Sequence, residues 1–244
     1  MSRPLFSIAL VVGLSLAGPA QAETVTAAVA ANFTAVAETL AERFSEQTSH
    51  EVVLSFGSTG QLYAQIANAA PFDVFLAADE IRPGQAIAEG YAVAGTDFVY
   101  AVGRLVLYSP TIDVEVGHTA LEGDFQHLAI ADPVAAPYGT AAVQVLEGLG
   151  LADTIADRIV TGENISQALQ FVESGNAELG FVAASQVVGK PFQWMVPETL
   201  HAPIAQRAVL LEAGADSQAA MAFLDYLQSP EGITIIEAAG YGVP

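Results

Sequence analysis

Two short polar segments of the chain have the composition and position to bind an anion. Ala31-Asn32-Phe33-Thr34 separates a strand-like run from a helix-like run, and Gly57-Ser58-Thr59-Gly60 occupies the same kind of junction. The start of a helix leaves backbone N–H groups without partners, and amide or hydroxyl side chains add further donors. Each segment can therefore receive an oxyanion, although helix capping by Asn32 or Ser58 explains a single copy more simply.

The second half of the chain offers two more helix starts. Tyr138-Gly139-Thr140 opens a helix after a proline-bearing loop, and Asn164-Ile165-Ser166 opens another. Taken alone, Tyr138 is typical of a partly buried aromatic residue and Ile165 of a core residue, which would contribute only its backbone N–H. Four such helix starts can together surround one ligand.

Other residues with potential chemistry favour structural roles. Asp73 and Asp79 flank a buried strand, and hydrogen bonding within the fold is the preferred interpretation of this pair. The chain lacks the G-x-S-x-G and H-E-x-x-H motifs and a complete P-loop, so signals for an enzyme are weak. Four histidines show no spacing typical of a metal site: His50, His118, His127 and His201.

The elements around the first two segments alternate between strand and helix. We expect strands at residues 24–30, 51–56 and 72–77 and helices at 33–44 and 61–69. Repeated alternation of this kind predicts a mostly parallel sheet with helices on both faces and a ligand at the carboxyl ends of its strands. The segments beginning at Ala31 and Gly57 should therefore converge.

A long strand-like stretch, residues 98–108, indicates a crossing from one lobe to another near Gly103. We expect lobe 1 to comprise residues 23–102 and 212–244, and lobe 2 residues 103–211, with the run 205–211 returning the chain. The remaining predicted elements are strands at 127–131 and 179–183 and helices at 139–149, 166–174, 217–227 and 230–239.

The N-terminus and the composition indicate an exported protein. Residues 1–22 combine Arg3, an apolar run and Ala20-Gln21-Ala22, which is the pattern of a cleaved signal peptide. Later stretches fall short of the ~20 apolar residues that a membrane-spanning helix needs. The formal charge of −20 makes nucleic acid a poor partner, and the absence of cysteine excludes disulfides, thiol nucleophiles and cysteine-ligated metals.

Over most of residues 23–244, the chain resembles the periplasmic molybdate-binding proteins of ABC importers. The motifs that carry the resemblance follow strands or begin helices in both halves of the chain. They are Ala30-Ala31-Asn32-Phe33, Ser55-Phe56-Gly57-Ser58-Thr59-Gly60 with Leu62 and Gln65-Ile66, Phe72-Asp73-Val74-Phe75 through Ala78-Asp79, Ala131-Asp132-Pro133 with Pro137-Tyr138-Gly139, Glu163-Asn164-Ile165, and Tyr226-Leu227 through Gly240-Tyr241-Gly242.

The resemblance implies an α/β, two-lobed periplasmic-binding-protein fold of the type II kind. Each lobe would be a mixed, mostly parallel sheet flanked by helices, with the ligand in the cleft between the lobes. Some relatives have a tyrosine where this chain has Ala184, and this departure bears on the set of donors. Carried over by position, the family's oxyanion contacts fall on Asn32, on Ser58 or Thr59, on Tyr138, and on the backbone N–H of Ile165.

The same resemblance implies capture of molybdate and tungstate in the periplasm and delivery to the membrane permease of an ABC importer. The protein would be a monomer without catalytic activity or a cofactor, and molybdenum would be held only as its oxyanion. Three alternatives stay open: a binding protein for another oxyanion or a small carboxylate, a sensory module, and a secreted hydrolase using Ser58 with a His and an Asp.

Overall fold

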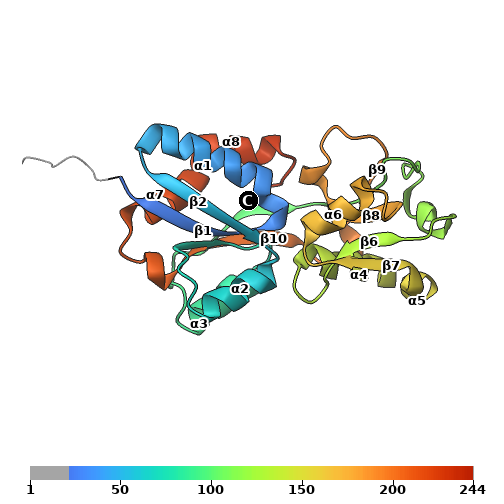
Figure 1. Ribbon diagram of the computed structural model, residues 1–244, viewed down its shortest axis with the longest axis horizontal. Coiled ribbons are helices and arrows are strands. Elements are labelled where there is room, and N and C mark those ends of the chain that lie inside the picture. Colours follow the sequence, from blue (N-terminus) through green and yellow to red (C-terminus); the bar gives the residue numbers. More distant parts are fainter. Residues whose placement is uncertain (1–21, 244) are drawn as a thin grey trace, which may run out of the picture.

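The computed structural model describes residues 22–243, which form two lobes side by side (Figure 1). Each lobe is built on one five-stranded sheet. In spatial order, the first sheet contains β2 (Glu51–Gly57), β1 (Thr24–Ala30), β3 (Val74–Leu76), β10 (Ile204–Leu210) and β4 (Phe98–Gly103). The second contains β7 (Ile159–Gly162), β6 (Leu128–Ala131), β8 (Leu179–Ala183), β5 (Leu105–Tyr108) and β9 (Gln193–Met195).

Both sheets are mixed and mostly parallel, as expected. In the first sheet, β1 runs parallel to β2 and β3, whereas β10 runs antiparallel to its neighbours β3 and β4. In the second sheet, β6 runs parallel to β7 and β8, and β5 runs antiparallel to β8 and β9. The parallel strands of each sheet therefore end at a common edge, which is where ligands bind in open α/β sheets.

The helices flank the two sheets and connect their parallel strands. The α-helices are α1 (Thr34–Thr48), α2 (Thr59–Ala67), α3 (Ile81–Ala88), α4 (Pro137–Gly148), α5 (Ala152–Ile155), α6 (Ile165–Glu173), α7 (Gln218–Leu227) and α8 (Pro230–Ala238). The 3-10 helices are η1 (Ala31–Phe33), η2 (Gly117–Glu122), η3 (Ala156–Arg158), η4 (Ala184–Gln186), η5 (Glu198–Leu200) and η6 (Glu212–Gly214). Among the described residues, no helix is both long and apolar enough to cross a membrane.

The core of the first lobe lies on both faces of its sheet. Helices α1, α7 and α8 cover one face, and α2 and α3 cover the other (Figure 1). The inward stripe of α1 repeats at helical spacing, which is why this segment forms a helix that packs on a sheet. Its buried members are Val36, Ala37, Leu40, Ala41 and Phe44.

Two chain crossings join the lobes. The first lies where expected, because β4 ends at Gly103 in one sheet and β5 begins at Leu105 in the other. The second precedes β10, which is hydrogen-bonded between β3 and β4 in the first sheet. The expected lobe 2, residues 103–211, therefore ends too late, since β10 belongs to lobe 1. An apolar run indicates a buried strand but does not indicate the sheet to which the strand belongs, so the periodicity of the sequence could not assign β10 to lobe 1.

Most predicted elements are present with shifted boundaries, and the structure adds α3 in the first lobe and α5, β7 and β9 in the second, which the sequence analysis did not predict. Helix α2 begins at Thr59, whereas the sequence predicts Gln61, because Ser58 caps the helix. Helix α3 was not predicted, since Pro83 and Gly84 within it are typical of turns. Nearly all of the expected signal peptide, residues 1–22, lies outside the described residues.

Candidate functional site

A small cavity lies between the two lobes at the carboxyl ends of their parallel strands. About 190 Å³ of this hollow is free of protein atoms. All five residues selected from the sequence line it: Asn32, Ser58, Thr59, Tyr138 and Ile165. The other lining residues are Ala30, Ala31, Gly57, Ala78, Ala136, Pro137 and Asn164. The structure therefore brings together residues from four separate segments, three of them beginning α-helices and one a 3-10 helix that leads into α1.

The helix starts give this cavity a positive electrostatic character without charged side chains. Asn32 lies in η1 ahead of α1, Thr59 is the first residue of α2, Tyr138 the second of α4, and Ile165 the first of α6. Unpaired N–H groups at such positions attract anions. Among the described residues that line the cavity there is no Lys, Arg, Asp, Glu or His.

Ser58 and Thr59 both present hydroxyl groups whose protons are uncommitted within the protein. Ser58 is the N-cap of α2, and its Oγ accepts a 3.4 Å hydrogen bond from the backbone N–H of Gln61. Thr59 Oγ1 accepts a 3.0 Å bond from the backbone N–H of Ala78. Each hydroxyl accepts in these bonds and keeps its proton for donation. Both side chains are buried, so both remain candidate donors.

Tyr138 contributes a buried hydroxyl that has no hydrogen-bond partner in the protein. Its ring is 1% exposed and is held near the start of α4, behind Pro137. The helix approaches β6 so closely that a Cβ on Gly139 would overlap the carbonyl oxygen of Ala131. Burial, together with the nearby Tyr241 and Tyr100, raises the pKa of Tyr138 well above its ordinary value of 10. The hydroxyl therefore keeps its proton and remains a donor.

Asn32 lines the cavity, but its side-chain amide is not the free donor that the sequence suggests. Its Nδ2 donates to Gln206 Oε1 at 2.8 Å and to the Tyr241 hydroxyl at 3.0 Å. These bonds use both amide protons. The expectation of an Asn32 side-chain donor for the ligand is therefore corrected: the donor that Asn32 retains for an anion is its backbone N–H at the start of η1.

Sequence reasoning missed the buried polar cluster behind Asn32. Gln206, on β10, is fully buried, and its Oε1 also accepts a 3.1 Å bond from the Tyr100 hydroxyl. Tyr241, near the C-terminus, donates to the backbone carbonyl of Asn32 at 2.7 Å. The available signal was a glutamine in the strand-like run Ile204–Leu210, whose other residues are apolar except Arg207, since a polar residue on a buried strand needs a partner.

Direct hydrogen bonds between the lobes surround the cavity. On one side, the Gly60 N–H donates to the Ala135 carbonyl at 2.8 Å. On the other side, Ser166 Oγ donates to the Ala31 carbonyl at 3.1 Å, and Ser185 Oγ donates to the Tyr241 hydroxyl at 2.9 Å. The lobes are thus closed on each other. Ala184, where some relatives have tyrosine, is the first residue of η4 and immediately precedes Ser185.

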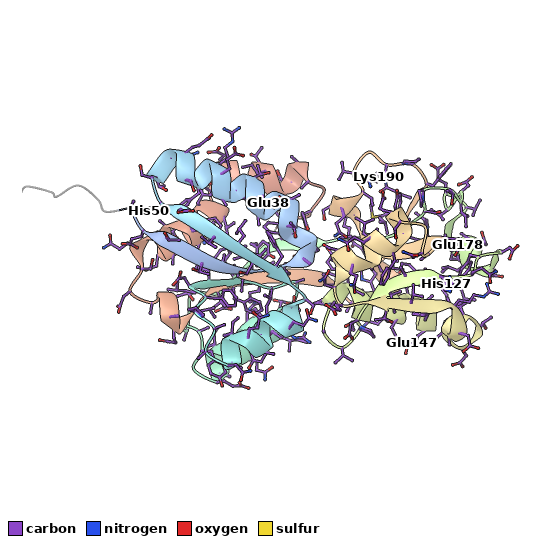
Figure 2. All side chains as sticks on the ribbon, in the orientation of Figure 1. Glu38, His50, His127, Glu147, Glu178 and Lys190 are labelled. Atoms are coloured by element: carbon purple, nitrogen blue, oxygen red, sulfur yellow. The ribbon has the colours of Figure 1, made fainter. Side chains whose placement is uncertain are left out.

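The remaining candidates have structural roles. Asp73 accepts a hydrogen bond from the Thr26 N–H, and Asp79 accepts one from the Arg82 N–H, which confirms the preferred interpretation of this pair. His50 and His127 lie in different lobes, far apart in Figure 2. Across residues 22–243, no three His, Cys, Asp or Glu side chains gather in a way that could hold a metal ion.

Two α/β lobes joined by two crossings, with a cavity of neutral donors between them, define a two-lobed solute-binding protein. Comparisons with known proteins agree, because residues 25–242 match the family described as bacterial extracellular solute-binding proteins. The chain belongs to this family. Its members bind solutes and are not enzymes, so family membership argues against the hydrolase alternative.

Individual relatives agree with the resemblance found in the sequence. The chain is 52% identical to the molybdate-binding protein ModA of Rhodobacter capsulatus, over 96% of this chain and 94% of the relative. It is 51% identical to ModA of Azotobacter vinelandii, over 97% and 96% of the two chains. Among solved structures, the Azotobacter vinelandii periplasmic molybdate-binding protein has a TM-score of 0.86 at 39% identity, covering 90% of this chain and 99% of that one.

Proposed function

We propose that this protein captures molybdate in the periplasm and delivers it to the membrane permease of an ABC importer. The observation that carries the proposal is the unpartnered, buried hydroxyl of Tyr138 at a cavity formed by helix starts from both lobes. A buried donor without a partner costs free energy, so its retention indicates a ligand that accepts from it. The two relatives described above are molybdate-binding proteins, so molybdate is the first ligand to test.

The proposed ligand contacts come from both lobes. Lobe 1 supplies the backbone N–H of Asn32 and the hydroxyl of Ser58 or Thr59, and lobe 2 supplies the hydroxyl of Tyr138 and the backbone N–H of Ile165. All of these groups donate, so the site favours an oxyanion whose oxygens carry no proton. Because no cationic side chain lines the cavity, its dimensions decide between molybdate and smaller tetrahedral anions such as sulfate.

Delivery follows from the closed arrangement of the lobes. An anion that contacts donors on both lobes binds the closed state more tightly than the open state, so it shifts the equilibrium toward closure. The closed surface is then available to a permease. The signal peptide expected at residues 1–22 would place this cycle in the periplasm, where the mature chain acts as a monomer.

Calorimetric titration of residues 23–244 with molybdate, tungstate, sulfate and phosphate at fixed salt tests the proposal. We expect one-to-one binding of molybdate, and of tungstate as an oxyanion of the same shape and charge, with sulfate and phosphate much weaker. Preference for sulfate, phosphate or a small carboxylate would assign the protein to another ligand. No heat with any of the four anions would contradict oxyanion capture.

A further inference from the structure

The hydroxyl of Ser166 reaches from lobe 2 to the peptide group whose N–H is the proposed Asn32 donor. Its Oγ donates a 3.1 Å hydrogen bond to the carbonyl oxygen of Ala31, in lobe 1. That oxygen and the N–H of Asn32 belong to one planar peptide group. Ala31 and Asn32 line the cavity, whereas Ser166 is half-buried outside it. Ser166 therefore contacts the peptide of a proposed ligand donor and not the cavity itself.

The start of α6 places two donors next to each other in the chain. Ile165, the first residue of the helix, supplies the N–H proposed for the ligand, and Ser166 follows it directly. Helix α6 lies at the edge of lobe 2 that faces lobe 1 (Figure 1), in contact with η1. The bond from Ser166 to Ala31 joins the two lobes, so it exists only while they are closed. The same closure brings Ile165 and Asn32 to one cavity.

The direction of this hydrogen bond is fixed by Gln186 on η4. The amide oxygen of Gln186 accepts from the Ala183 N–H at 3.2 Å, so its amide nitrogen is the end that faces Ser166. Gln186 Nε2 donates to Ser166 Oγ at 3.1 Å. A serine hydroxyl has one proton, and an oxygen that accepts from Gln186 directs that proton away from the amide. The Ala31 carbonyl, which can only accept, receives it.

Ser166 is the donor to the Ala31 carbonyl that depends on closure. The same oxygen accepts from the backbone N–H and from the hydroxyl of Thr34, the latter at 2.9 Å. Thr34 begins α1 within lobe 1, so its two bonds persist when the lobes separate. Each donor to a peptide carbonyl withdraws electron density and makes the N–H of that peptide a stronger donor. Closure therefore adds polarisation at the Asn32 N–H as an anion is enclosed.

We propose that Ser166 is a positioning residue, whose hydroxyl fixes and polarises the peptide between Ala31 and Asn32 so that the Asn32 N–H binds the enclosed oxyanion more tightly. This inference rests on the proposed function. The effect is reciprocal, because an anion on the N–H increases the negative charge on the carbonyl oxygen and strengthens its bond to Ser166. Anion binding and lobe closure are thus coupled through one peptide group. Gln186 contributes indirectly, by keeping the Ser166 proton on the Ala31 carbonyl.

Nitrogen-15 NMR of the molybdate-saturated protein separates polarisation of this peptide from support of closure alone. A hydrogen bond to a peptide carbonyl polarises the peptide and moves the resonance of its amide nitrogen downfield. In Ser166→Ala we therefore expect the Asn32 amide nitrogen to resonate upfield of its position in the parent protein. Ser185→Ala is the matched control, because it also removes a hydroxyl that bonds across the lobes, to the Tyr241 hydroxyl and the Asn32 carbonyl. That carbonyl belongs to the next peptide, so the Asn32 nitrogen should stay in place.

Calorimetric titration with molybdate measures the effect on affinity. Ser166→Ala should weaken binding about three- to tenfold, and Ser166→Thr, which keeps the hydroxyl, should bind within about twofold of the parent protein. Gln186→Met should weaken binding about threefold in the parent and have almost no effect in the Ser166→Ala background, since its role passes through that hydroxyl. Gln193→Met controls for loss of a glutamine amide from lobe 2, because Gln193 Nε2 bonds to the carbonyls of Val187 and Lys190.

The outcomes distinguish this inference from the proposed function. An upfield shift of the Asn32 nitrogen in Ser166→Ala and not in Ser185→Ala, with affinity kept in Ser166→Thr, supports the positioning role. An unmoved Asn32 resonance in Ser166→Ala, an equal shift in Ser185→Ala, an equal loss of affinity in Ser166→Thr, or additive effects of Ser166→Ala and Gln186→Met would overturn it alone if the parent protein binds molybdate normally. If the parent protein binds no molybdate, the proposed function fails and this inference fails with it.

Discussion

Ser185 Oγ donates a hydrogen bond of 2.9 Å to the hydroxyl of Tyr241, and this bond joins the two lobes. Ser185 follows β8 of the second sheet, whereas Tyr241 packs in the core of the first lobe. The bond is adjacent to the cavity, because Tyr241 in turn donates to the Asn32 carbonyl at 2.7 Å. Closure of the lobes and the shape of the ligand site are therefore coupled through three residues.

Loss of this bond should weaken ligand binding by favouring the open state. Ser185→Ala is expected to lower molybdate affinity about three- to tenfold, because one hydrogen bond of the closed state is lost. Calorimetry measures the affinity, and small-angle scattering measures the ligand-dependent decrease in radius of gyration. Ser174→Ala is the control, since that hydroxyl donates to carbonyls of its own helix and accepts from the nearby Asn176, so its bonds do not join the lobes. Equal affinities for Ser185→Ala and the parent would show that this bond does not support closure.

Removal of the Tyr138 hydroxyl should lower molybdate affinity much more than Ser185→Ala does. Tyr138→Phe keeps the ring and deletes a donor to a charged ligand, so we expect affinity to fall about 10- to 100-fold. Tyr108→Phe is a matched control in the same lobe, because Tyr108 is also buried but its hydroxyl donates to Glu173. A fall of the same size in both variants would indicate a general loss of stability instead of a lost ligand contact.

The affinity for a fully deprotonated oxyanion should be constant between about pH 6 and about pH 9. Tyr138 is the titratable side chain at the cavity, and burial raises its pKa well above 10. A raised pKa preserves the neutral, protonated form to higher pH, so the donor is present throughout this range. Molybdate titrations in a series of buffers check this. A decline in affinity with loss of one proton below pH 9 would contradict the assignment of Tyr138 as a buried donor.

Two helical glycines should respond in opposite ways to substitution by alanine. A Cβ on Gly139 would overlap the Ala131 carbonyl, so Gly139→Ala should destabilise the fold by about 2 kcal/mol or more and displace Tyr138. A Cβ on Gly84 would meet nothing within 4 Å, so Gly84→Ala in α3 should be neutral or stabilise by up to about 1 kcal/mol. Urea unfolding measures both. Equal stability for the two variants would refute the close approach of α4 to β6.

Local patterns in the sequence predict most of the elements and bring the right segments to the site. The apolar stripe of α1 and the polar junctions at Ser58 and Asn164 are local signals of helix bodies and helix starts. Parallel strand order then places these junctions at one edge. Helix α3 is not predicted by local patterns, because Pro83 within it is typical of turns. Its stability depends on packing against the rest of the lobe.

Relationships between distant parts of the chain are not visible in local patterns. Asn32 and Gln206 are 174 positions apart, so nothing near Asn32 shows that its amide is already bonded. The same limit explains the misplaced boundary at residue 211, since the sheet that contains β10 is decided by pairing with β3 and β4. Which donors remain free for a ligand is therefore a property of the folded protein.

The most direct test of the account is a crystal structure of residues 23–244 grown with molybdate, with anomalous scattering used to locate molybdenum. The account predicts one strong anomalous peak in the cavity, with ligand oxygens within hydrogen-bond distance of Tyr138 Oη, the Ile165 N–H and a hydroxyl of Ser58 or Thr59. A peak elsewhere, or an oxyanion held by a lysine or arginine side chain, would contradict the proposed site of neutral donors.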